Sequence, residues 1–152
     1  AKALAEADVE DIANTIKPVG FYRVKARKIK EIAKIILDKY NGVVPKDMDE
    51  LLKLPLVGRK TANCVLVFGY GIPAIPVDTH VHRISNRLGI ISTKNPLESE
   101  KALMSVVPTA YWRQFNWLLV QFGRKICRPV RPKCDICPLQ DICDYYKENW
   151  QK

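Results

Sequence analysis

Four cysteines near the C-terminus have the spacing of a metal or cluster site. Cys127, Cys134, Cys137 and Cys143 follow a C-x6-C-x2-C-x5-C pattern in the segment CRPVRPKCDICPLQDIC. Four thiolates this close in sequence can converge only if the chain wraps around a group that binds them. An iron–sulfur cluster is favoured over structural zinc, because zinc sites commonly use two close ligand pairs and only one close pair occurs here. From spacing alone, zinc and a pair of disulfides stay open as alternatives.

A lysine in the stretch KLPLVGRKTANC is the second candidate for chemistry. A phosphate-binding P-loop would need glycine immediately before Lys-Thr and again five residues earlier, but Arg59 and Leu54 hold those positions. Lys60 is expected instead in the first turn of a helix that begins after Gly58. The positive end of a helix dipole disfavours an ammonium ion there and promotes the nucleophilic amine. The alternative is an ordinary solvated lysine.

Asp78, in the segment PVDTHVHR, is the third candidate. It stands where the N-cap of the following helix belongs. A carboxylate can also stabilise developing positive charge or accept a proton, and capping would fix its position for that work. The fifth cysteine, Cys64, lies in the apolar run TANCVLVF and is expected in the core.

The elements that must position these residues all have helical patterns. Apolar residues from Ile29 to Tyr40 have the spacing of one face of an amphipathic helix, which Asn41-Gly42 would end. Proline, glycine and capping signals predict further helices at 47–53, 59–68, 78–89, from 95 onward and at 110–122. No segment is typical of a strand. The fold class is therefore predicted to be all-α.

Composition and charge narrow the function classes. The 152 residues are 47% apolar, enough for a sizeable core, and carry 25 basic against 16 acidic residues, a net charge of +9. That balance favours a polyanionic partner, nucleic acid first. No apolar run approaches the ~20 residues of a membrane-spanning helix, and no signal peptide is visible. We therefore expect no membrane association and a cytoplasmic protein.

Three features together resemble the endonuclease III family of DNA glycosylases. The cysteine spacing is similar to the family's 4Fe-4S loop, LPLVGRKTA to its helix-hairpin-helix, and VDTHVHR to the segment with its catalytic aspartate. Their order and separations agree over essentially all 152 residues, and AIPVDTHVHRISNRLG is most similar to archaeal-type members. The resemblance implies helix-hairpin-helix glycosylase architecture. Residues 1–72 would form a helical barrel, incomplete at its N-terminus, and residues 73–152 an iron–sulfur cluster helical domain.

The resemblance also implies a function. The protein would be a monomeric base-excision repair enzyme, a bifunctional DNA glycosylase and AP lyase acting on double-stranded DNA with an oxidised or saturated pyrimidine or an abasic site. Lys60 would form a Schiff base and allow β-elimination, with Asp78 assisting. The four cysteines would hold a 4Fe-4S cluster, and the protein would be nucleoid-associated in a prokaryotic-like cell. The rival functions are a non-catalytic, zinc-containing DNA-binding module and a monofunctional mismatch glycosylase.

Expected DNA contacts come from three places. The hairpin turn would offer backbone N–H groups to a phosphate. Phe21 would be the apolar wedge that fills the gap left by a flipped base, with core packing as its alternative. Basic residues of the first cluster loop would meet phosphates. The complete expected set is Phe21, Leu56, Val57, Gly58, Arg59, His80, Arg83, Arg128, Arg131 and Lys133.

Two features depart from the family pattern. Leu56 stands where the hairpin normally has glycine, and a positive φ there would cost leucine ~1–2 kcal/mol. Family members also have several helices before the point that matches Ala1. We therefore expect the chain to be a fragment, or to be preceded by further residues in the natural protein.

Overall fold

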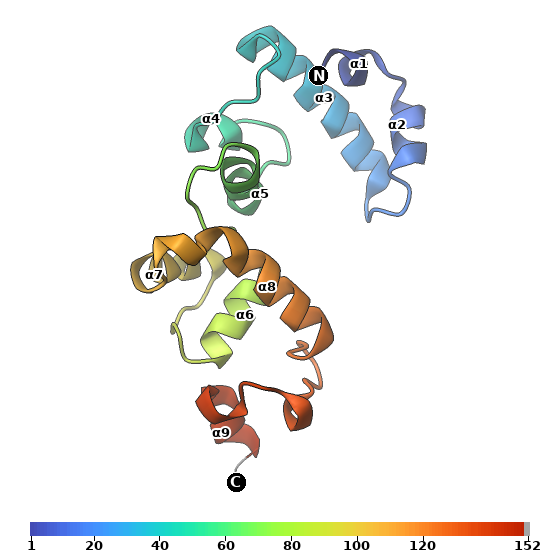
Figure 1. The fold of residues 1–152 in the computed structure, drawn as a ribbon. Coiled ribbons are helices and arrows are strands. Elements are labelled where there is room, and N and C mark those ends of the chain that lie inside the picture. Colours follow the sequence, from blue (N-terminus) through green and yellow to red (C-terminus); the bar gives the residue numbers. More distant parts are fainter. Residues whose placement is uncertain (151–152) are drawn as a thin grey trace. The chain divides into compact units, whose positions relative to one another are not determined.

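The computed structural model describes residues 1–150 as helices joined by loops (Figure 1). Residues 1–150 contain no strand, and the all-α prediction is confirmed. The chain forms two compact units, Ala1–Ala62 and Asn63–Lys152. This division falls before the expected boundary at residue 72, and Val67 and Gly71 line a pocket together with Trp112 of the second unit.

Three helices make up most of the first unit. Helices α1 (Lys2–Glu6) and α2 (Val9–Thr15) both pack on the long helix α3 (Tyr22–Tyr40) (Figure 1). Their core includes Ile12, Ala13 and Ala26. Helix α3 ends at Asn41 in the left-handed conformation, as its Asn-Gly sequence predicts, but it begins at Tyr22 rather than Ile29. Helices α1 and α2 were not predicted from the sequence.

The predicted helical hairpin follows. Helix α4 (Met48–Leu52) is capped by the side chain of Asp47, and helix α5 spans Arg59–Cys64. In the turn between them, the Val57 N–H donates to the Leu54 carbonyl at 3.1 Å, and the Leu54 side chain is buried. Leu56 has φ +58°, and its side chain is 62% exposed. Leucine therefore occupies a left-handed position without burial to compensate it.

The second unit is built around α6 and α8. It comprises the π-helical turn η1 (Val65–Gly69), α6 (Thr79–Arg87), α7 (Pro96–Val106), the short turn η2 (Thr109–Tyr111) and α8 (Trp112–Lys125). Val81 of α6 and Leu103 of α7 are fully buried in its core. The Asn116 side chain of α8 donates to the Pro76 carbonyl at 2.9 Å, which fixes the extended segment that leads into α6.

The chain ends with two short turns, η3 (Cys134–Ile136) and η4 (Gln140–Ile142), and helix α9 (Asp144–Trp150). Within residues 124–150, the buried side chain is that of Cys134. Apolar packing therefore contributes little to this segment. No helix among residues 1–150 has the length and apolar character needed to cross a membrane.

Gly123 tests the packing of α8 on α6. A Cβ atom at Gly123 would lie 2.4 Å from Nδ1 of His80 and 3.0 Å from Cδ1 of Ile84. We expect Gly123→Ala to lower the free energy of unfolding by about 1–3 kcal/mol, although alanine normally stabilises a helix relative to glycine. Denaturant unfolding measures the change. Gly69→Ala is the matched control, because its Cβ would meet nothing nearer than 4.0 Å. Equal effects of the two substitutions would contradict the proposed close approach.

Leu56 tests the hairpin strain. Leu56→Gly should raise the free energy of unfolding by about 0.5–1 kcal/mol, because relief of a cost of ~1–2 kcal/mol exceeds the added entropy of an unfolded glycine. Gly58→Ala is the control in the same turn, since it has no positive φ and its Cβ would meet no atom within 4 Å. A destabilised Leu56→Gly protein would show that the leucine side chain supports the fold.

Candidate functional site

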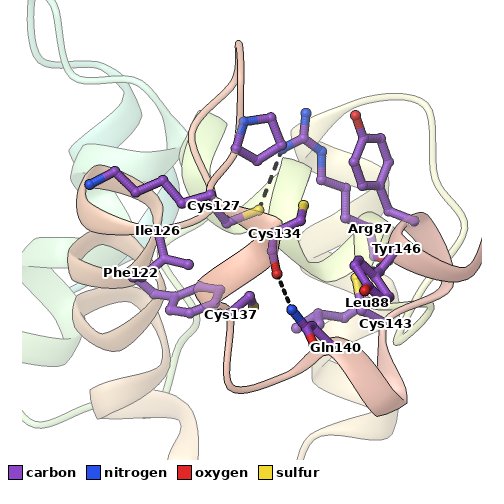
Figure 2. Close-up of a pocket in the computed structure, with 13 residues that line it drawn as sticks. Arg87, Leu88, Phe122, Ile126, Cys127, Cys134, Cys137, Gln140, Cys143 and Tyr146 are labelled. Carbon is purple, nitrogen blue, oxygen red and sulfur yellow. Dashed lines mark hydrogen bonds between the residues drawn. The ribbon is translucent and has the colours of Figure 1, made fainter. Parts of the chain in front are cut away.

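The four clustered cysteines line one cavity. Its walls come from α6, α8, α9 and the cysteine loop (Figure 2). All five cysteines are free thiols, so the disulfide alternative is wrong. Cys64 is only partly buried and does not line this cavity.

The chemistry of the cavity fits an iron–sulfur group. Burial raises the pKa of the Cys134 thiol, and the nearby Cys127, Cys137 and Cys143 raise it further. The lining contains cationic and apolar side chains but no carboxylate. Among the described residues, no three Cys, His, Asp or Glu side chains are grouped to hold a single metal ion. Four cysteines that line one cavity supply the thiolate donors by which iron–sulfur clusters are held.

Hydrogen bonds shape the cysteine loop without help from an apolar core. The Gln140 side-chain amide donates to the Cys134 carbonyl (Figure 2). The Cys137 N–H donates to the same carbonyl at 3.1 Å, and the Cys143 N–H donates to the Gln140 carbonyl at 3.1 Å. The Gln140 side chain, from η4, thus links this turn to η3 through the Cys134 carbonyl.

Asp78 is the N-cap of α6, as predicted. Its Oδ1 accepts from the backbone N–H groups of His80 and Val81, each at 2.9 Å. Both bonds use Oδ1, so Oδ2 retains its lone pairs for another partner. The cap therefore fixes the carboxylate while leaving one oxygen for chemistry.

His80 and Arg83 bind other parts of the second unit. Nη2 of Arg83 donates to the Cys127 carbonyl at 2.9 Å and lies 3.1 Å from Nδ1 of His80. Burial lowers the pKa of Arg83, while Cys127 opposes the shift. Asp78, His80, Arg83 and Cys127 therefore form a connected polar series from the cap of α6 to the first cysteine. DNA contacts by His80 and Arg83 stay a prediction.

The remaining candidates are exposed except Val57, which is half-buried. In the first unit, Lys60 is the second residue of α5 and is exposed. Phe21 has φ +57° and is 85% exposed, so its alternative role in a core is wrong. Among the predicted loop contacts, Arg128, Arg131 and Lys133 are exposed in the second unit, and Arg131 has φ +49°.

Arg87 lines the cysteine cavity and was not among the site residues predicted from the sequence (Figure 2). A basic residue in the last turn of a helix is common, because it complements the helix dipole. Its contacts with the cysteine loop come from distant sequence positions, so no local signal could have identified them.

Comparison with known proteins identifies the family. Residues 1–109 match the HhH-GPD superfamily base excision DNA repair protein, and residues 127–143 match the iron–sulfur binding domain of endonuclease III. The chain is 51% identical over 144 residues to Endonuclease III of Thermotoga maritima, covering 95% of this chain and 68% of that protein. Endonuclease III of Bacillus subtilis is 48% identical over 136 residues, covering 89% of this chain and 62% of that protein.

A solved structure agrees with these matches. The structure of a trapped endonuclease III–DNA covalent intermediate, an estranged-adenine complex, superposes with a TM-score of 0.85 at 44% identity. The match covers 95% of this chain and 68% of that one. Both relatives are bacterial, so the expected archaeal-type character is not supported. The chain belongs to the HhH-GPD superfamily of base excision DNA repair proteins and carries the iron–sulfur binding domain of endonuclease III.

Proposed function

We propose that the protein is a bifunctional DNA glycosylase and AP lyase of base excision repair. The observation that carries the proposal is an exposed lysine at the start of the hairpin's second helix, in a chain 44% identical to a protein trapped covalently on DNA. Its substrates are duplexes with an oxidised or saturated pyrimidine, or with an abasic site. It acts as a monomer on the DNA of a prokaryotic-like nucleoid.

Lys60 is the nucleophile. Its uncharged amine attacks C1′ of the damaged nucleotide, a C–N bond forms, and the bond from C1′ to the base breaks. The sugar ring opens to a Schiff base, in which the positive nitrogen acidifies the C2′ hydrogen. Loss of that proton expels the 3′ phosphate, which breaks the strand by β-elimination. The exposure of Lys60 supports this role, because the amine must reach carbon on another molecule.

Asp78 assists this displacement. Positive charge builds on the sugar as the base leaves, and a fixed carboxylate stabilises that charge. The carboxylate can also accept a proton from the lysine ammonium. Capping holds Oδ1 to two backbone N–H groups, so Oδ2 is the oxygen assigned to this work.

The remaining contacts hold and open the duplex. Backbone N–H groups of the hairpin face a phosphate at Leu56 and Gly58, and Arg59 also contacts it, while the N–H of Val57 closes the turn on Leu54. Phe21 is the wedge. Its side chain is exposed rather than packed in the first unit, and its backbone is in the left-handed conformation. Lys133 and the two loop arginines add phosphate contacts. The four cysteines hold a 4Fe-4S cluster that shapes this loop and takes no part in the chemistry.

Lys60→Ala tests the nucleophile. On an abasic-site duplex with borohydride, the parent protein should form a covalent cross-link and Lys60→Ala should form none, because the Schiff base cannot form. Lys39→Ala, which removes another exposed lysine of the first unit, should cross-link like the parent. Cross-linking by Lys60→Ala at the parental level would overturn the assignment. It would show that another amine forms the Schiff base. A parent protein that forms no cross-link would instead favour a monofunctional glycosylase or a non-catalytic DNA-binding module.

Asp78→Asn separates capping from chemistry. Asparagine caps helices about as well as aspartate, so the free energy of unfolding should change by less than about 0.5 kcal/mol. Base excision in single-turnover assays should slow by roughly 10²–10³-fold, because the charge opposite the sugar is lost. Asp78→Ala, which also loses the cap, should cost about 1 kcal/mol of stability. Excision by Asp78→Asn within a few-fold of the parental rate would contradict the electrostatic role.

A further inference from the structure

Arg87, near the end of α6, donates hydrogen bonds to the start of the cysteine loop. Its Nη1 donates to the Arg128 carbonyl at 2.7 Å, and its Nη2 donates to the Pro129 carbonyl at 3.0 Å. Nη1 also donates to Sγ of Cys127 at 3.4 Å (Figure 2). The planar guanidinium thus holds two successive carbonyls and reaches the sulfur of the first cysteine, a geometry that lysine cannot reproduce.

The same residue also contacts the far end of the loop. The guanidinium carbon lies 4.4 Å from the centre of the Tyr145 ring in α9, a cation–π arrangement. The Arg87 carbonyl lies 3.4 Å from Sγ of Cys143. Once Cys143 is a ligand it carries no proton, so this contact records proximity rather than a bond in the loaded protein. Arg87 therefore meets both the first and the last of the four cysteines.

These contacts matter because little else fixes the segment. Among residues 124–150 the buried side chain is Cys134, so hydrophobic burial cannot hold the loop ends together. Val81 and Ile84 of α6 are fully buried, and they anchor the helix from which Arg87 extends. A rigid helix thus presents a fixed guanidinium to a loop without a core of its own.

We propose that Arg87 is a positioning residue for the iron–sulfur cluster, closing the loop at both ends and donating a hydrogen bond to the Cys127 thiolate. This inference rests on the iron–sulfur centre. The N–H···S bond and the positive charge offset the negative charge of the thiolates. Because reduction adds a further electron, loss of Arg87 lowers the reduction potential of the cluster as well as its retention.

The test uses holoprotein purified without oxygen, with Arg87→Gln, Arg87→Lys and Tyr145→Leu beside the parent. Bleaching of the visible cluster absorption in air gives retention, and protein-film voltammetry gives the potential. Arg87→Gln should bleach about tenfold faster or more, and its potential should fall. Arg87→Lys should also bleach faster than the parent. Its reduction potential should fall less than that of Arg87→Gln, because the positive charge remains. Tyr145→Leu should bleach faster at an unchanged potential, because the N–H···S bond survives.

Arg124→Gln is the matched control for charge, since Arg124 is exposed at the end of α8. Parental bleaching and potential in Arg87→Gln would overturn the proposal. If Arg87→Gln does not fold, Arg87→Lys becomes the test. Bleaching of Arg87→Lys at the parental rate would then contradict loop closure by Arg87. A parent protein that contains no iron and sulfide would refute the iron–sulfur centre itself, an outcome distinct from failure of the Arg87 role.

Discussion

The convergence of four cysteine sulfurs is the constraint on which the C-terminal part of this protein depends. The last 27 described residues, 124–150, bury one side chain, Cys134, and their regular structure is limited to two short turns and one short helix beyond the end of α8. A segment like this cannot offset its conformational entropy by hydrophobic burial. Ligation supplies the missing free energy, as it does in small metal-binding domains whose binding energy is folding energy. The loop and its basic residues therefore depend on the cluster for their arrangement.

Helix α6 contacts the cysteine loop and also carries the Asp78 carboxylate at its N-cap. Its N-cap is Asp78, its middle residue Arg83 binds the Cys127 carbonyl, and its last residue is Arg87. Fully buried Val81 and Ile84 hold the helix against the core of the second unit. One rigid element thus fixes a carboxylate at one end and a cysteine loop at the other. In the proposed function, the cluster supports a DNA-binding surface, and Lys60 and Asp78 perform the reaction.

Local signals in the sequence predicted much of this structure. Apolar periodicity predicted α3 from Ile29 to Tyr40, and N-cap residues predicted the starts of α4, α6 and α7. Both signals depend on residues close in sequence. The hairpin leucine was expected to be strained if its φ were positive, and φ is +58°. Helices α1 and α2 were missed because they are short and gain their stability from packing on α3. The cysteine grouping was visible in the sequence, but Arg87 and the exposed left-handed Phe21 depend on the three-dimensional structure.

The proposed function depends on Lys60 as the nucleophile. The most direct measurement is peptide mapping by mass spectrometry of the borohydride-reduced protein–DNA adduct. A sugar remnant bonded to Nζ of Lys60 is the predicted result. A remnant on another lysine or on an α-amino group, with Lys60 unmodified, would show that Lys60 is not the nucleophile.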